Sequence, residues 1–434
     1  MIPSEATSLN FLGLCFIFSA GFLVFVLPRR LAFIPILITA CYITYGQQIV
    51  ILGFNFTVLR LVILIAWIRL FARSELRALR LNSIDKVFIS WLITSFVVNM
   101  LLWQTHEALT NNLGRAFNAL GLYFLFRVLI RDISEIENFI KKSAIIILPL
   151  ALIMIFESFS GENIFAFFGG VPEISSVRNG HVRAQGPFRF AGLAGTVGAV
   201  LMPLYVALWF SERTKFNAII GFAAATIIMI AAHSSGPLLS YCIGILALMM
   251  WPLRRRMRIV QYAIFFSIIF LHMVMKAPVW YLIARVSSIT GGTGWHRSEI
   301  IDAAIRNFNE WWLIGTQNTG NWVPYFFGVD SSSYGTERAD ITNQYIAEGV
   351  NGGLVSMLLF VIIIILCFRE IGIALQRNED QPLSIQIIIW SLGASLLVHI
   401  TDFLSVSYFD QTIVFWYLLI AMISALSLQK QQPV

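Results

Sequence analysis

The stretch Gly349-Val-Asn-Gly-Gly-Leu-Val-Ser-Met-Leu-Leu-Phe-Val-Ile-Ile-Ile-Ile-Leu-Cys367 decides the fold of this chain. It carries no charged residue, and an apolar run of about 18 or more residues is long enough to cross a bilayer as a helix. Comparable runs recur along the whole sequence. They predict thirteen spans, at about 8–28, 31–46, 49–71, 87–104, 114–131, 143–158, 190–210, 217–233, 237–252, 259–275, 347–367, 384–399 and 412–428. We therefore expect an all-α, polytopic integral membrane helical bundle of about 12–13 transmembrane helices.

The composition supports one membrane domain over residues 1–434. The sequence is 58% hydrophobic and only 12% charged, whereas soluble domains carry roughly 25% charged residues. The net charge of +7 does not point to nucleic acid, because in a membrane protein the location of the charges matters more than their sum. The four cysteines lie in apolar runs without metal-ligand spacing. We expect no disulfide framework, no metal and no cofactor.

The basic residues predict the orientation of the bundle. Nineteen of the 30 Lys and Arg residues fall in one alternating set of short segments, and nine fall in the opposite set. The positive-inside rule makes the richer side cytoplasmic, with the N-terminus outside and the C-terminus inside. The first apolar run lacks the flanks of a signal peptide and is expected to remain as a span. Eight of the nine outer basic residues lie in two long external loops, at about 159–189 and 276–346.

The first external loop concentrates positive charge directly before a span. Arg178, His181, Arg183 and Arg189 fall within twelve residues. Guanidinium groups bind phosphate through paired hydrogen bonds and stay charged at any working pH. We interpret this loop as an anion site for a lipid phosphate or pyrophosphate. Contacts with ordinary lipid headgroups or ion pairs within the loop are the alternatives.

The second external loop predicts a helix that starts near residue 293. Its polar face carries His296, Arg297 and Glu299. Arg297 either shares the anion site with Arg183 or lies on the bilayer surface in an amphipathic helix. The aromatic residues that follow fit an interfacial belt, and a saccharide contact at Trp322 or Trp312 is the alternative.

The second loop ends with a set of polar residues that leads into the span at 347–367. Asp340 and Asn343 share one face of a helix predicted from about Asp340, and Tyr345 and Glu348 lie near another. Asp340 or Glu348 could act as a base for a sugar hydroxyl, or could serve as an acid that stabilises a helix start. Arg60 and Arg127 lie inside spans, and His399 and Asp402 could form a pair near a span end.

Four segments together resemble the O-antigen polymerase and ligase superfamily of bacterial inner membranes. They are Arg183-Ala-Gln-Gly-Pro-Phe188, His233-Ser-Ser-Gly-Pro-Leu-Leu239, Trp295-His-Arg-Ser-Glu299 and Asp340-Ile-Thr-Asn-Gln-Tyr-Ile-Ala-Glu-Gly-Val-Asn-Gly-Gly353. The resemblance implies a metal-independent, inverting, GT-C-like membrane glycosyltransferase. Such enzymes act at the periplasmic face on sugars carried by undecaprenyl pyrophosphate, and a chain-length regulator can be a further partner.

The resemblance also implies roles for individual residues. Arg183 and Arg297 would hold the pyrophosphate, together with Arg189. We add His296, Asn343 and Tyr345 to the expected substrate-binding residues, and the expected catalytic residues are Asp340, Glu348 and Arg297. Ligases of the family carry a histidine directly before the asparagine of the last motif, whereas this chain has Thr342 there. A polymerase that elongates an exopolysaccharide therefore fits better than a ligase. A lipid-linked oligosaccharide flippase or a scaffolding subunit are the other classes, although no internal repeat favours a transporter.

Overall fold

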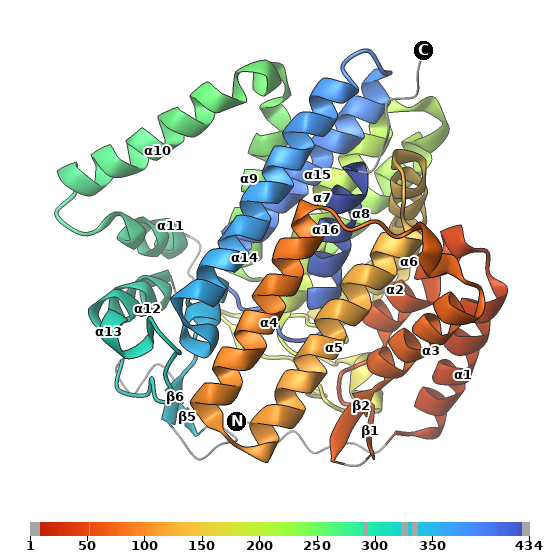
Figure 1. Cartoon of the computed structure of the whole chain (residues 1–434), viewed down its shortest axis with the longest axis horizontal. Helices are drawn as coiled ribbons and strands as arrows, with labels where there is room; N and C mark the ends of the chain where they lie inside the picture. Colours follow the sequence, from red (N-terminus) through yellow and green to blue (C-terminus); the bar gives the residue numbers. More distant parts are fainter. Residues whose placement is uncertain (1–8, 52, 290–293, 323–328, 332–336, 428–434) are drawn as a thin grey trace.

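The computed structural model describes residues 9–51, 53–289, 294–322, 329–331 and 337–427. It is 75% helical, and most of its long helices run side by side in one bundle (Figure 1). The α-helices are α1 (Phe11–Val26), α2 (Phe33–Tyr42), α3 (Val58–Ala72), α4 (Ser83–Trp103), α5 (His106–Leu129), α6 (Ile133–Ser160), α7 (Ala191–Ala207), α8 (Lys215–Ala231), α9 (Ser235–Met249), α10 (Met257–Val274), α11 (Leu282–Ile289), α12 (Gly294–Arg306), α13 (Phe308–Trp311), α14 (Gln344–Arg377), α15 (Leu383–Asp402) and α16 (Ile413–Leu426).

Short elements connect these helices. The 3-10 turns are η1 (Arg29–Leu31), η2 (Glu75–Ala78), η3 (Ile164–Phe168), η4 (Leu208–Phe210), η5 (Glu212–Thr214), η6 (Trp251–Arg256) and η7 (Val279–Tyr281). The three antiparallel hairpins are β1 (Gln48–Ile51) with β2 (Phe54–Thr57), β3 (Val177–Arg178) with β4 (His181–Val182), and β5 (Val329–Ser331) with β6 (Glu337–Ala339).

Each of the thirteen predicted segments contains a helix. Within the described residues, seven helices are long and apolar enough to cross a membrane: Ser83–Trp103, Ile133–Ser160, Ala191–Phe210, Glu212–Ala231, Trp251–Val274, Gln344–Arg377 and Leu383–Asp402. The apolar helices α1, α9 and α16 are shorter. The protein is thus an all-α polytopic membrane protein.

Several predicted boundaries differ, two of them because polar side chains cap the helices elsewhere. The segment at 49–71 begins as the hairpin β1–β2, and α3 starts only at Val58, where the Thr57 hydroxyl accepts a hydrogen bond from the N–H of Arg60 (3.3 Å). Helix α6 starts about ten residues before its prediction, since the Asp132 carboxylate caps it at the N–H of Glu135 (2.8 Å). Hydropathy alone does not register such caps.

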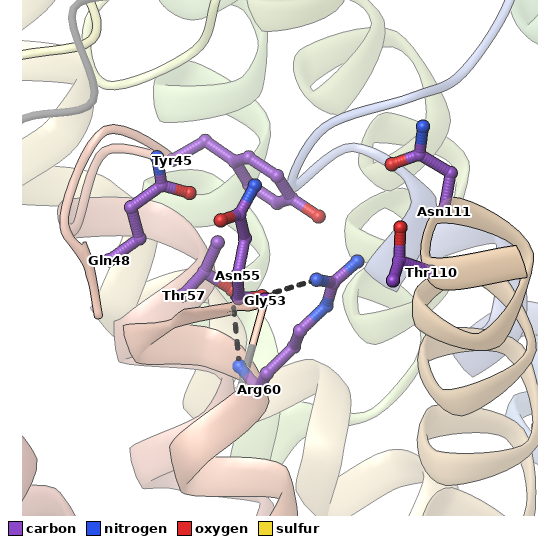
Figure 2. Close-up of a pocket in the computed structure, with 8 residues that line it drawn as sticks. All are labelled: Tyr45, Gln48, Gly53, Asn55, Thr57, Arg60, Thr110 and Asn111. Carbon is purple, nitrogen blue, oxygen red and sulfur yellow. Dashed lines mark hydrogen bonds between the residues drawn. The ribbon is translucent and has the colours of Figure 1, made fainter. Parts of the chain in front are cut away.

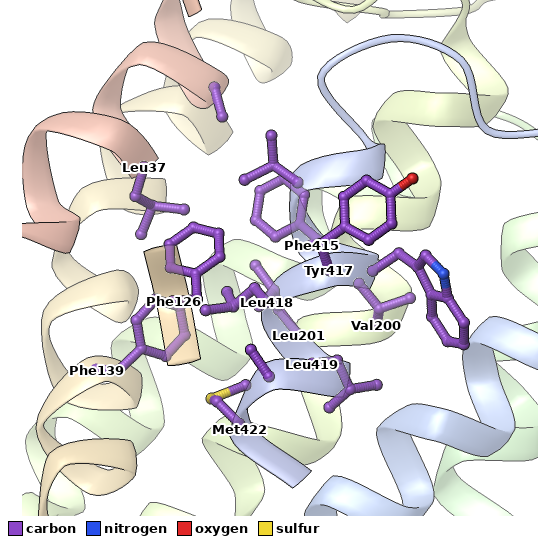
Figure 3. Close-up of a cluster of buried hydrophobic side chains, with 14 of the residues drawn as sticks. Leu37, Phe126, Phe139, Val200, Leu201, Phe415, Tyr417, Leu418, Leu419 and Met422 are labelled. Atoms are coloured by element: carbon purple, nitrogen blue, oxygen red, sulfur yellow. The ribbon is translucent and has the colours of Figure 1, made fainter. Parts of the chain in front are cut away.

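Helices α7 and α16 form the centre of the bundle. Every residue of α16 from Val414 to Leu426 is buried. Figure 3 shows its side chains meeting Leu37, Phe126 and Phe139 on one side and Val200 and Leu201 of α7 on the other. A helix that is apolar on all sides belongs in the interior. These two helices therefore supply the scaffold on which the other spans are arranged.

Glycines at every third position let α7 pack closely against its neighbours. A Cβ on Gly198 would lie 2.3 Å from the carbonyl oxygen of Ala225 in α8, and one on Gly195 would lie 3.0 Å from Cβ of Ala232. Small residues at such contacts allow helix backbones to approach in a bilayer. The close approach brings the start of α9, which follows α8, next to α7.

Arg127 lies in a buried ion pair. Its guanidinium Nε is 3.1 Å from Oδ1 of Asp85 in α4, and both side chains are within 1% of complete burial. The Tyr123 hydroxyl donates to the same carboxylate oxygen (2.5 Å). A charge in the membrane interior is tolerated when it is paired in this way. Arg127 therefore fixes α5 to α4.

Helix α14 is interrupted at Gly353, whose φ of 72° is left-handed. The interruption frees both carbonyl and N–H groups of the helix, and the backbone of the preceding segment bonds to them. The N–H of Thr316 donates to the carbonyl of Val350 (3.0 Å), and the N–H of Leu354 donates to the carbonyl of Trp312 (2.7 Å). A broken membrane helix is tolerated where protein covers it. The break ties the segment after α13 to the bundle.

Candidate anion-binding site

Glu157 near the end of α6 holds the loop that carries Arg183. Its buried carboxylate accepts hydrogen bonds from the Ser175 hydroxyl (2.7 Å) and from the backbone N–H groups of Gln185 (2.8 Å) and Gly186 (2.9 Å). A carboxylate that is buried and fully hydrogen-bonded fixes the backbone that surrounds it. Arg183 lies between these anchored residues, so its position is set by a membrane helix.

The hairpin β3–β4 presents Arg178 and His181 beside the same loop. Asn179 and Gly180 form its turn with φ angles of 51° and 78°, as the Asn-Gly sequence favours in a two-residue hairpin. The imidazole of His181 stacks on that of His233, with ring centroids 4.8 Å apart and an interplanar angle of 11°. His233 connects α8 to α9. The stacked rings therefore link the loop to the start of α9.

Arg297, from the segment at 276–346, also lies close to the start of α9. It lies in the first turn of α12. A Cβ built on Gly236 in the first turn of α9 would lie 3.4 Å from Nη2 of Arg297 and 2.4 Å from Oγ of Ser405. The absence of a side chain at Gly236 thus leaves space that the guanidinium group approaches.

Asp402, at the end of α15, lies close to Arg297 and to the start of α9. It is fully buried. Its carboxylate accepts hydrogen bonds from the Thr196 hydroxyl, from Ser240 Oγ (3.3 Å) and from the Tyr408 hydroxyl (3.3 Å). Hydroxyl donors from three elements satisfy the carboxylate without neutralising it. Its negative charge faces Arg297 and favours the charged form of that guanidinium group.

The guanidinium groups of the two segments affect one another. Burial lowers the pKa of Arg297, the charge of Asp402 opposes that effect, and Arg178 and Arg183 lower the pKa further. Burial likewise lowers the pKa of Arg183, and Arg178 adds to the effect. The geometry agrees, because the hairpin that carries Arg178 stacks on His233, and Arg297 approaches Gly236 three residues further on. Like charges influence one another when they are close. We call Arg178, Arg183 and Arg297 the arginine cluster.

The positive charge of the arginine cluster is not fully compensated by neighbouring acidic groups. Within the part of the chain that the structure describes, neither Arg183 nor Arg297 forms an ion pair, and Nε of Arg183 is buried without a hydrogen-bond partner. An orphaned buried donor carries a desolvation penalty that a bound acceptor would relieve. Among the described residues no group of three or more His, Cys, Asp or Glu side chains is placed to hold a metal ion. The arrangement fits an anion rich in oxygen acceptors.

Arg189 lies apart from these contacts. Its side chain is exposed, its backbone N–H donates to Oδ2 of Asp410 (3.0 Å), and its guanidinium carbon is 5.8 Å from the ring centroid of Phe409. Burial raises the pKa of Asp410, and the Arg189 N–H and charge oppose that effect. Arg189 is thus held by the connection between α15 and α16.

His296 and Asp340 lie together next to the arginine cluster. Burial lowers the pKa of His296, whereas the charge of Asp340 and a hydrogen bond to its backbone raise it. Asp340 is exposed and precedes α14, whose first helical residue is Gln344. The predicted helix start near Asp340 therefore lies about four residues too early, and Asp340 occupies an open position beside α12.

The other three predicted site residues have roles in the fold. The buried Asn343 side chain caps α14 by accepting a hydrogen bond from the N–H of Ile346 (3.2 Å). The Tyr345 hydroxyl donates to the carbonyl of Ile400 (3.0 Å). Glu348 is buried against α4, where it accepts hydrogen bonds from Trp91 Nε1 (3.2 Å) and Gln344 Nε2 (2.8 Å). None of these hydrogen bonds involves the arginine cluster.

Arg60 lines a separate polar cavity of about 160 Å³ between the hairpin β1–β2 and α5 (Figure 2). Its Nε donates to Oδ1 of Asn118 (3.1 Å), and Nη1 donates to the carbonyl of Asn55. Thr110 and Asn111 of α5 line the opposite wall. These amide and carbonyl acceptors explain how Arg60 is accommodated here without a carboxylate partner among the described residues.

The stacked histidines predict a pH dependence. Burial, His181 and Arg183 all lower the pKa of His233 from its usual value of about 6.5, so His233 is neutral at pH 7. A bound anion would raise that pKa, and binding then takes up a proton. The affinity for inorganic pyrophosphate should therefore increase as the pH falls from about 7.5 to 5.5. In calorimetric titrations, the affinity of His233→Gln for pyrophosphate should change less with pH than that of the wild-type protein. Parallel profiles for the two proteins would contradict this coupling, since titration of the ligand is common to both.

These features define a class: an all-α polytopic membrane protein with a desolvated arginine cluster where α7, α9 and α12 begin. Comparison of the sequence with protein-family models and with curated proteins gave no match. The case for a function therefore rests on the residues and their geometry.

Proposed function

We propose that the protein is a membrane glycosyltransferase of the polysaccharide polymerase type. It would transfer a glycan chain from undecaprenyl pyrophosphate onto a lipid-linked repeat unit. The observation that carries the proposal is the convergence of Arg183 and Arg297, which come from different segments and lack an ion-pair partner among the described residues. A diphosphate offers the paired oxygen acceptors that two guanidinium groups bind.

The spatial arrangement of the four family-like segments supports the proposal. Arg183 acts on His233 of the second segment, and Arg297 of the third segment approaches Gly236 of the second. His296 of the third segment lies against Asp340 of the fourth. Segments spread over about 170 residues thus meet at one end of the bundle. This is the arrangement expected if they act on one substrate.

In the proposed reaction the bond between the anomeric carbon and the pyrophosphate oxygen breaks, and its electron pair stays on that oxygen. Arg183 and Arg297 stabilise the negative charge that develops there, and the partly desolvated setting strengthens this effect. A hydroxyl oxygen of the acceptor sugar attacks from the opposite face and forms the new glycosidic bond. Its proton leaves to a base or to water. The reaction releases undecaprenyl pyrophosphate and inverts the anomeric centre.

Asp340 is the better of the two proposed bases. It is exposed, and it lies beside His296 next to the arginine cluster. Glu348, in contrast, is buried and already accepts hydrogen bonds from Trp91 and Gln344. A base must reach the hydroxyl that it deprotonates, and Glu348 would first have to give up these partners. We assign Glu348 to the packing of α14 on α4.

The proposal includes an orientation. The arginine cluster would face the periplasm of a bacterial inner membrane, with the N-terminus periplasmic and the C-terminus cytoplasmic. The excess of basic residues in the opposite set of loops supports this orientation. The membrane-embedded, GT-C-like architecture and the lipid-linked substrate belong to the same proposal.

The direct test is polymerisation by the purified protein in proteoliposomes, with a lipid-linked repeat unit as the only sugar substrate. We expect a ladder of lipid-linked oligomers and release of undecaprenyl pyrophosphate. If the repeat unit stays unchanged while the protein is folded, the proposal fails.

Deletion of the gene separates the competing classes. Loss of a polymerase leaves surface glycan as single repeat units. Free polymer that is not attached to lipid A core would instead indicate a ligase, and lipid-linked intermediates trapped on the cytoplasmic face would indicate a flippase. An unchanged glycan pattern would leave only a scaffolding role.

A further inference from the structure

A second and much larger cavity lies at the other end of α9, where η6 leads into α10. It has a volume of about 1170 Å³ and is bounded by η6, α10, α14 and α15. No residue of α10 is buried, and Figure 1 shows this helix leaning away from the bundle. The first turn of α10, from Met257 to Gln261, therefore forms one wall of an open groove against α14 and α15.

The groove is lined by both apolar and basic side chains. The apolar ones belong to α14 and α15 and include Ile365, Phe368 and Leu397. The basic ones are five arginines, Arg254, Arg255, Arg256, Arg258 and Arg369. An amphipathic groove of this kind matches a molecule with a charged head and apolar chains.

The arginines of the groove carry little compensating negative charge. Among the described residues, Arg255 alone of the five forms an ion pair, with Glu379. Arg254 lies over the ring of Trp251, with its guanidinium carbon 4.1 Å from the ring centroid. A neutral helix in the groove would cover these charges and leave them unpaired, which is costly. An anionic headgroup would compensate them.

We propose that this groove binds an anionic phospholipid. Its phosphate would lie among the arginines of η6, α10 and α14, and its acyl chains would lie between α10 and α14. Basic pockets between membrane helices are known to bind anionic headgroups. The volume exceeds the roughly 300–1,000 Å³ of ordinary small-molecule pockets, as two acyl chains require. The inference is independent of the proposed polymerase activity.

Native mass spectrometry of the full chain, delipidated and then titrated with phosphatidylglycerol or phosphatidylcholine, tests the proposal. The wild-type protein should retain one phosphatidylglycerol with at least tenfold preference over phosphatidylcholine. The triple variant R254Q/R256Q/R258Q should bind phosphatidylglycerol about 10²-fold more weakly, if each arginine contributes about fivefold. It should therefore lose most of its preference over phosphatidylcholine.

Matched variants separate the groove from a general charge effect. The control R77Q/R80Q/R213Q removes three exposed arginines that lie outside the groove and form no ion pair among the described residues. It should retain the lipid. Equal loss in both triple variants, or equal binding of the two lipids by the wild type, would overturn the proposal.

A third variant tests the groove without changing its charge. A Cβ on Gly372 of α14, which lines the groove, would meet no atom within 4 Å. Gly372→Phe should therefore fill the groove with little effect on the fold and should reduce lipid retention, even if the arginine variant fails to fold. Undiminished retention in Gly372→Phe would place the lipid elsewhere. Recovery of an isoprenoid pyrophosphate as the retained lipid would also refute the assignment.

Discussion

Replacing Arg183 or Arg297 with alanine should reduce polymer formation by about 10²- to 10³-fold, the usual effect of removing one group that stabilises developing negative charge. Both guanidinium groups belong to one cluster, and Nε of Arg183 is buried without a hydrogen-bond partner, so each variant removes a charge from the place where the anion would bind. The measurement is the initial rate of oligomer formation from a lipid-linked repeat unit by purified variants. Release of undecaprenyl pyrophosphate should decrease in parallel.

The matched control for Arg297 is Arg306→Ala on the same helix. Arg306 is exposed and pairs with Glu299 and Asp302, and exposed ion pairs contribute little to stability. This variant should polymerise at close to the wild-type rate. Arg183→Lys and Arg297→Lys should recover only part of the activity, because lysine supplies the charge without the planar fork. Unchanged polymer in both alanine variants would remove the basis of the proposed site.

The helical content of the fold could be predicted from hydropathy, because each predicted segment contains a helix. The boundaries could not, since side-chain caps such as Thr57 and Asp132 set them. Neither could the interruption of α14, although Gly352 and Gly353 are visible in the sequence. That break depends on a segment about forty residues earlier, whose Thr316 bonds to the freed carbonyl. Contacts of this range leave no periodic signal.

The part of the candidate site that could be predicted from the sequence is the part where positive residues fall in segments predicted to lie outside the membrane. Arg183 and Arg297 attract attention because they fall in segments predicted to be external, where positive residues oppose the orientation rule. The polar residues around α14 were harder to interpret. Asn343 and Glu348 are residue types that are common in binding sites. In the structure, however, Asn343 caps a helix, and Glu348 accepts hydrogen bonds from Trp91 and Gln344. A single sequence does not distinguish a polar residue that binds substrate from one that satisfies the backbone.

Asp402 was underestimated for the opposite reason. The sequence places it beside His399 at a span end, which indicates only a local pair. In the structure the Tyr408 hydroxyl lies between the two, 3.0 Å from Nδ1 of His399 and 3.3 Å from Oδ2 of Asp402. The same carboxylate acts on Arg297, which lies more than one hundred residues earlier in the chain. We therefore interpret Asp402 as the positioning residue for Arg297.

This role predicts that Asp402 and Arg297 act as one unit. Asp402→Asn keeps the shape of the side chain and removes the charge that favours the Arg297 cation. The single variant should slow polymerisation by about 10- to 100-fold, within the usual range of coupling energies of about 0.5–3 kcal/mol. The double variant with Arg297→Ala should be no slower than Arg297→Ala alone. The measurement is a double-mutant cycle on the polymerisation rate, with the melting temperature of each purified variant recorded alongside.

Asp410→Asn is the matched control for this cycle. Asp410 is also buried, but its carboxylate binds the backbone N–H groups of Arg189 and Thr412 rather than the arginine cluster. Its effect should therefore multiply with that of Arg297→Ala, because independent sites contribute additive free energies. If Asp402→Asn also multiplied, Asp402 would support only the fold, and the charge of Arg297 would be held without it. If the effects of Asp402→Asn and Arg297→Ala are not additive in free energy while those of Asp410→Asn and Arg297→Ala are, the contribution of Arg297 to the rate depends on the charge of the buried Asp402 carboxylate.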